Sequence, residues 1–340
     1  MLTFKDDRLI TRLASEVIPA TANTQELQWR RSPAQAFFLA LVARTTSETL
    51  TRQMASSQDP QGMYILGPDG TPYGFTNDHE PEDILGFVDR GLRGYRAHPP
   101  GPVTISDAEV AAPWTVAPPR DGAVVRVYTR IRPLPKKVWG LNRGVGRDYL
   151  WLYPEDIADL IAASGGAEKV DPGTPVELPR ALVGRLVRFH MVDDVRGTPD
   201  MWRASEVRRL AFAGQVIRQE GPVRTLAWHG DFLMRGRRRS AVGERAIVEQ
   251  GHAGRLEGEI DLDVVARRVL RFRAFSEGQA WGEGTYTPYP PDGRFRLLVA
   301  MVEAAADDDI AHIVPPEAVA TQRSDAPYRQ AVLPQTAGTP

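Results

Sequence analysis

The first twenty or so residues, and a segment shortly after them, carry the apolar spacing of short helices and strands. Apolar positions at helical spacing predict a helix over 5–16, and the short apolar run 17–20 predicts a strand. Ser32 and Pro33 form an N-cap and first-turn pair, which predicts a second helix running through Val42. The chain therefore opens on a mixture of helix and strand.

A hairpin and a third helix follow. Residues 61–68 predict a strand that runs into the turn 68–70, and residues 71–75 predict its antiparallel partner. Pro81, followed by two acidic residues that suit the positive end of a helix dipole, predicts a helix with an apolar face ending near Tyr95. The predicted order is helix, strand, helix, hairpin, helix.

From Gly122 onwards the hydrophobic period changes to two, which is typical of strands. The clearest run is 255–263, where every odd position is charged and every even position is apolar or glycine. One helix interrupts the pattern at 153–163, and residues 187–192 are among the predicted strands. Six to eight antiparallel strands joined by Gly/Pro turns predict a β-sandwich or barrel.

These patterns predict an α+β protein with two domains. A mixed α/β module occupies 1–98, a proline-rich linker 99–121, and an antiparallel β domain with one helix 122–304. The remainder, 305–340, is rich in Ala, Asp and Pro, and we expect it to be extended or disordered.

The order of elements in 1–98, with the hairpin sequence Tyr64-Ile-Leu-Gly-Pro-Asp-Gly, resembles the second half of the thioredoxin fold. The resemblance covers about a quarter of the chain and implies that the family's redox motif would lie just before the helix that starts near Met1. The chain contains no cysteine, so dithiol chemistry is excluded. A missing first strand would leave an open sheet edge, to be completed by the second domain, by a partner including a second copy of the chain, or by upstream sequence.

Composition narrows the classes of partner. The 340 residues have a net charge of −1, so no overall field favours nucleic acid or an anionic membrane. The arginine-rich run 235–239 is a local basic patch at a predicted turn, without interleaved aromatic residues. No stretch has the length of a membrane span and no secretory signal is evident, so we expect a cytoplasmic protein that binds neither nucleic acid nor membrane.

Two of the six histidines, His190 and His229, lie inside predicted strands, each opposite in parity to the apolar positions. If the apolar set faces a core, both imidazoles face solvent or a groove, as surface residues or as candidate ligands. No two histidines lie within five residues of each other, so a metal site would need several strands, and we predict no metal and no cofactor.

The predicted loop 193–203 concentrates groups that bind ligands. Its candidate residues are Asp193, Asp194, Arg196, Asp200 and Trp202. Asp193 is expected to bind either a cation or Arg196, and adjacent carboxylates at a strand end point to opposite faces. Trp202 is expected either to line a pocket or to plug the end of the domain in a salt-bridged loop.

The segment 276–284 is the third candidate. It surrounds Trp281 with glycines, which predicts a bulge or tight corner on which the indole packs. Glu277 and Glu283 form a candidate carboxylate pair for hydrolytic chemistry.

No serine-hydrolase elbow or nucleotide-binding loop is present. We therefore predict a non-redox binding or interaction protein that holds a small ligand or a protein partner at the loop end of the β domain. The alternative is a hydrolase or isomerase with an Asp/Glu/His site in the same domain. A homo-oligomer paired through the open edge of the N-terminal sheet is a further expectation.

Overall fold

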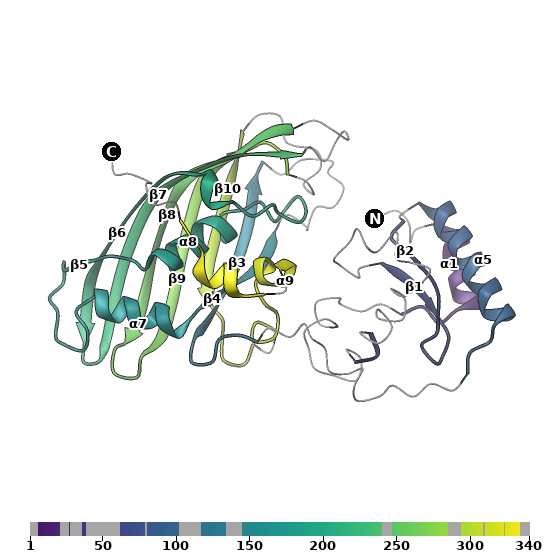
Figure 1. Cartoon of the computed structure of the whole chain (residues 1–340), viewed down its shortest axis with the longest axis horizontal. Helices are drawn as coiled ribbons and strands as arrows, with labels where there is room; N and C mark the ends of the chain where they lie inside the picture. The colour runs from purple at the N-terminus through teal and green to yellow at the C-terminus, as the bar shows by residue number, and fades with distance from the viewer. Residues whose placement is uncertain are drawn as a thin grey trace. The chain divides into compact units, whose positions relative to one another are not determined.

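The computed structural model divides the chain into two compact units, Met1–Thr115 and Val116–Pro340 (Figure 1). The boundary falls inside the predicted linker 99–121, most of which lies outside the described residues. The structure describes residues 6–20, 27, 36–38, 62–78, 80–101, 117–133, 145–239, 247–284, 294–308, 310–322 and 324–333.

In the first unit, two helices and a hairpin form a small core. The elements are α1 (Asp7–Glu16), β1 (Met63–Leu66), β2 (Pro72–Thr76) and α5 (Pro81–Ala97). Strands β1 and β2 pair antiparallel, and Leu9 of α1 packs with Ile84, Phe87 and Val88 of α5. The predicted hairpin and the helices at both ends are present.

Two other predictions for this unit have different outcomes. Residues 17–20 are not a strand, because α1 ends at Glu16 and the chain leaves it as an irregular segment. The helix predicted from Ser32 to Val42 lies mostly outside the described residues; 36–38 are helical. The resemblance to thioredoxin stays a prediction.

The second unit is built on one antiparallel sheet with strand order β4-β3-β10-β9-β8-β7-β6-β5. Its strands are β3 (Ala123–Arg132), β4 (Gly146–Leu152), β5 (Pro175–Val176), β6 (Val207–Glu220), β7 (Val223–Arg239), β8 (Ile247–Asp263), β9 (Arg268–Trp281) and β10 (Arg294–Glu303). The described strands leave β4 and β5 as open edges, so the predicted sandwich or barrel is not confirmed. An open sheet needs another layer to cover its apolar face.

Helices supply that layer. Figure 1 shows α7, α8 and α9 on one face of the sheet. The helical elements are α7 (Pro154–Ala163), α8 (Arg180–His190), the 3₁₀ turn η2 (Ala204–Glu206), α9 (Glu317–Gln322) and α10 (Ala326–Gln330). None of the helices in the described ranges is long and apolar enough to cross a membrane.

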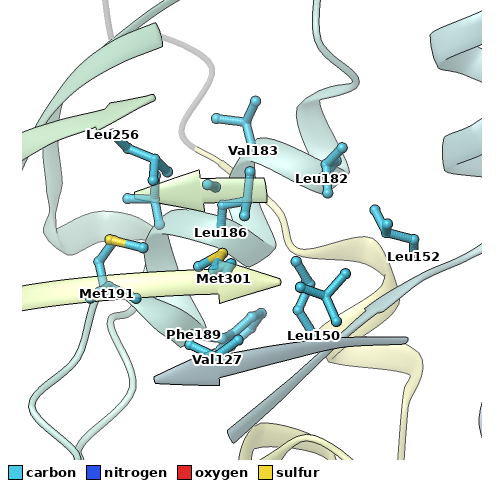
Figure 2. Packing of buried hydrophobic residues seen from close by; sticks show 14 of the residues in the cluster. Val127, Leu150, Leu152, Leu182, Val183, Leu186, Phe189, Met191, Leu256 and Met301 are labelled. Carbon is cyan, nitrogen blue, oxygen red and sulfur yellow. The ribbon is translucent and has the colours of Figure 1, made fainter. Parts of the chain in front are cut away.

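Helix α8 is the centre of the core. Figure 2 shows Leu182, Leu186 and Phe189 of α8 among side chains of the sheet, including Val127 of β3 and Met301 of β10. The prediction of a strand over 187–192 is wrong because α8 is buried on nearly all sides. Residues 187–190 alternate between apolar and polar, as a strand does, and polar side chains of α8 are buried with the apolar ones: Arg185 and His190 are both 1% exposed.

The expectation of an extended or disordered tail is also wrong for its described part. Residues 317–322 and 326–330 form α9 and α10, and Tyr328 is completely buried. Helix α8 holds this segment, since Arg185 Nη1 donates to the carbonyl of Arg329 at 2.6 Å and Arg188 Nη1 to that of Val332 at 2.8 Å. We call residues 317–333 the C-terminal strap.

The contact between α8 and the strap is tight enough to predict the effect of one methyl group. A Cβ added to Gly184 would lie 2.1 Å from the carbonyl oxygen of Ala331. We therefore expect Gly184→Ala to destabilise the protein by about 1 to 3 kcal/mol, although alanine is the better helix former. Urea unfolding measures the loss, and limited proteolysis should cut the strap sooner.

Gly86 of α5 is the matched control. A Cβ there would meet only the flexible end of Arg90, at 3.3 Å. Gly86→Ala should leave stability unchanged or raise it by up to about 1 kcal/mol, as propensity alone predicts. Equal effects of the two substitutions would contradict the close packing of the strap.

Candidate functional site

A layer of polar side chains lies buried between the helices and the sheet, and the predicted site residue His190 belongs to it. His190 is the last residue of α8 and is 1% exposed. Its Nδ1 lies 3.0 Å from Oδ2 of Asp148, which β4 points toward the helices, and its Nε2 lies 2.8 Å from the hydroxyl of Tyr328. His190 therefore faces neither solvent nor a groove, because it is on a buried helix rather than on a strand.

Both ends of this Asp148–His190–Tyr328 chain are anchored in the backbone. Asp148 Oδ1 accepts the amide hydrogen of Glu317 at 2.8 Å, and the Tyr328 hydroxyl accepts that of Trp151 at 3.3 Å. Burial raises the pKa of Tyr328 well above its ordinary value, so the phenol stays neutral. The chain connects β4, α8 and the C-terminal strap by hydrogen bonds and close polar contacts.

A second buried pair lies beside it. Arg185 of α8 forms an ion pair with Asp156 of α7, and both side chains are almost completely buried. Burial raises the pKa of Asp156, against the opposing effect of the Arg185 guanidinium. Neither residue was a candidate from the sequence. Charged residues in amphipathic segments such as α7 and α8 are normally expected on the solvent-exposed side.

Asp194 is the carboxyl group most perturbed by its surroundings. Burial, and then the nearby carboxylates of Asp148, Glu317 and Asp193, raise its pKa to about 9. At neutral pH the group is therefore protonated and carries no charge.

The two predicted segments 193–203 and 276–284 meet in space. Arg196 pairs with Asp193 through its Nε, and its Nη2 donates to the carbonyl oxygen of Gly282 at 2.9 Å. Its guanidinium also stacks 4.5 Å from the centre of the Phe295 ring. Asp193 thus binds Arg196, one of its two predicted partners, and the pair fastens the loop to the end of β9.

Trp202 is buried in the same loop. Its indole Nε1 donates to the carbonyl of Met191 at 2.9 Å, and Arg238 stacks 5.4 Å from its ring. Arg238 in turn pairs with Glu206 and lies 3.9 Å from Asp200. Trp202 is packed within a salt-bridged loop, which is the second of its two predicted roles.

Glu277 and Glu283 do not form the predicted carboxylate pair. Glu277 is exposed on the outer face of the sheet, where it pairs with Arg296, whereas Glu283 is buried beyond the end of β9. Trp281 packs over a glycine as predicted, but the glycine is Gly251 on neighbouring β8. A glutamate pair for hydrolysis is therefore not assembled here.

The buried layer has the chemistry of a structural network. Hydrogen bonds to the hydroxyl of Tyr328 and to the backbone hold part of it, while His190 Nδ1 and Arg185 Nη2 meet carboxylate oxygens as close ion-pair contacts without a hydrogen bond. His190 and Tyr328 are 1% and 0% exposed, so a substrate has no access to them. Within the described residues, no group of three His, Asp or Glu side chains is arranged to hold a metal ion.

The opposite face of the sheet carries a groove of about 570 Å³, within the size range of ligand sites. Strands β6 to β10 contribute its walls. Its lining residues include Ala213, Ala227, His229, Arg255, Glu257, Glu259, Arg273, Phe275, Ala300 and Val302. His229 faces this groove, in agreement with its predicted parity.

The register explains why this surface is hollow. His229, Glu257, Phe275 and Ala300 occupy one row across β7, β8, β9 and β10. Small alanine side chains at both sides of the row leave space, while long charged side chains form the rim. Phe275 is 44% exposed, so the groove offers an aromatic surface to solvent.

A scan against family models, a search of curated proteins and a search of solved structures each return no match for this chain.

The environment of Asp194 predicts how stability depends on pH. Its pKa is higher in the folded chain, about 9, than the ordinary value of 3.8, so folding takes up a proton between these values and stability falls as pH rises through this window. Asparagine cannot ionise. Asp194→Asn should therefore raise the free energy of unfolding at pH 8 by about 1 to 3 kcal/mol and change it little below pH 4.

Urea titrations at several pH values measure this difference. Asp159→Asn, at an exposed position of α7, is the matched control and should leave the pH profile unchanged. A profile for Asp194→Asn that runs parallel to that of the wild type would show that Asp194 is ionised in the folded protein.

Proposed function

We propose that this chain is a non-catalytic binding protein that holds its ligand or partner on the outer face of the large sheet. The observation that carries the proposal is the groove on that face, with Ala227, Phe275 and Ala300 in its lining and charged residues at its rim. The loop end around Arg196 and Trp202, where the sequence placed the binding site, is filled by its own side chains. We therefore keep the binding role expected from the sequence but propose the outer face of the sheet, instead of the loop end, as its location.

The composition of the groove suits recognition better than reaction. Apolar surface with a few polar groups at the edge is typical of binding sites, because the apolar part supplies affinity and the polar groups fix orientation. His229 and Glu257 are neighbours across β7 and β8, both exposed. Groups in contact with water lack the burial that tunes a general acid or base.

The alternative is a hydrolase or isomerase with an Asp/Glu/His site. The contact of His190 with Asp148 and Tyr328 is the arrangement that most resembles such a site. The side chains of His190 and Tyr328 are sealed from solvent, which favours a structural role for this cluster. The binding function therefore has the better support.

Filling the groove tests the proposal. Ala300 lies between Phe275 and Tyr128 on the outer face, so Ala300→Trp would occupy the groove without entering the core. Screening a mixture of aromatic carboxylate and amide fragments by saturation-transfer NMR should give hits with the wild type. We expect Ala300→Trp to weaken the affinity of these fragments by about tenfold, measured by titrating each fragment, which corresponds to about 1.4 kcal/mol of binding free energy.

Ala211→Trp is the matched control, since Ala211 is exposed on β6 outside the groove lining. Circular dichroism checks that both variants fold. Fragments that bind the two variants equally, or no fragment binding to the wild type, would overturn the proposed function.

A further inference from the structure

One end of the outer sheet face is rich in arginine. The run 235–239 is not a turn but the end of β7, where successive side chains alternate between the two faces. Arg235, Arg237 and Arg239 are exposed on the outer face, whereas Arg238 points inward to Glu206. A run that is continuous in sequence is therefore divided between the surface and the core.

Strands distant in sequence extend the same basic surface. The row that starts at Arg235 crosses Gly251 and Trp281 and reaches Arg294 on β10. In the next row, Arg296 of β10 faces Arg132 of β3. We call the exposed arginines of these three strands the arginine edge: Arg235, Arg237 and Arg239 of β7, Arg294 and Arg296 of β10, and Arg130 and Arg132 of β3. From β7 to β3 the arginine edge spans about 19 Å at the usual strand spacing.

The arginine edge carries more positive charge than its neighbours neutralise. Glu249 pairs with Arg235 and Glu277 with Arg296. Among the described residues, Arg130, Arg132, Arg237 and Arg239 form no ion pair. Like charges held side by side on adjacent strands destabilise each other, so a ligand that supplies negative charge is favoured here.

The arginine edge adjoins the groove, since Arg255 of the groove lining lies one row from the row of Arg296. We propose that the partner is a protein with an extended acidic segment, whose carboxylates bind the arginine edge and whose adjoining apolar residues enter the groove. This inference rests on the proposed function and specifies the partner.

A nucleic acid strand fits the same surface less well. The groove rim includes Glu257 and Glu259, which would repel a phosphate backbone leaving the arginine edge. The Trp281 indole is also engaged: it packs over Gly251, donates to Glu249 and has the Arg294 guanidinium 4.9 Å from its centre. Arginine and aromatic side chains around an apolar groove are instead the composition of protein interfaces.

The experiment uses the full chain and three fluorescein-labelled probes of equal length. The first is a peptide with about six glutamates, enough to span the arginine edge in extended form, followed by alternating leucine and serine. The second replaces its glutamates by lysines, and the third is an oligothymidylate. We expect anisotropy to report binding of the acidic peptide, weakening by about tenfold or more between low and physiological salt.

Charge reversal identifies the surface. The triple variant Arg130→Glu, Arg132→Glu, Arg237→Glu should reduce the affinity for the acidic peptide by about tenfold or more. The control triple, Arg90→Glu, Arg93→Glu, Arg120→Glu, makes the same change in net charge at exposed positions outside the arginine edge and should change it less than about twofold.

The other outcomes overturn the inference in distinct ways. No binding of the acidic peptide, or equal effects of the two triple variants, would exclude the arginine edge as its site. Tighter binding of the oligothymidylate would point to nucleic acid. If Ala300→Trp abolishes fragment binding while the arginine variants leave the peptide unaffected, the proposed function stands and only the partner class is wrong.

Discussion

The structure of the second unit depends on the burial of α8. A helix with Leu182, Leu186 and Phe189 in the core and almost no exposed surface needs covering on every side, and one sheet cannot supply that. The C-terminal strap covers what the sheet leaves open. The buried polar layer follows from the same packing. The side chain of His190, and the backbone groups where α8, β4 and the C-terminal strap meet, are shielded from water and therefore need polar partners within the protein.

This arrangement gives the two faces of the sheet different surroundings. The inner face is closed by α8 and the strap, and its ionisable groups are held there by contacts that fix the layers in one geometry. The outer face has no such layer among the described residues and keeps its charged side chains, the groove and the arginine edge accessible. The groups that hold the layers together and the groups proposed for binding thus lie on opposite faces of one sheet, and residues adjacent in sequence, such as Arg237 and Arg238, point to different faces.

The sequence predicted those features that depend on local pattern. The alternation from 207 onwards gives the long strands, and the parity of His229 places it correctly on the outer face. The pattern misled where polar residues are buried: residues 187–190 alternate as a strand does, so the end of α8 was predicted as a strand and His190 was assigned to the surface. Tyr328 and Asp148 have no local signal at all, because their significance comes from contacts between segments far apart in the chain. The arginine edge was missed for the same reason, since only one of its three strands contains an arginine run.

The position of β10 in the sheet has a consequence for how the chain folds. Strand β10 lies between β3 and β9, so the hairpin of β3 and β4, made early, can join the sheet only after the strands that follow it have been completed. Until then the apolar side chains of β3 and β4 and one unpaired edge of β3 are exposed. Pairing between strands far apart in sequence is slow, and exposed apolar surface and strand edges promote aggregation in the meantime. During synthesis the β10 side of β3 therefore stays without its partner strand until the last strand of the sheet has been made.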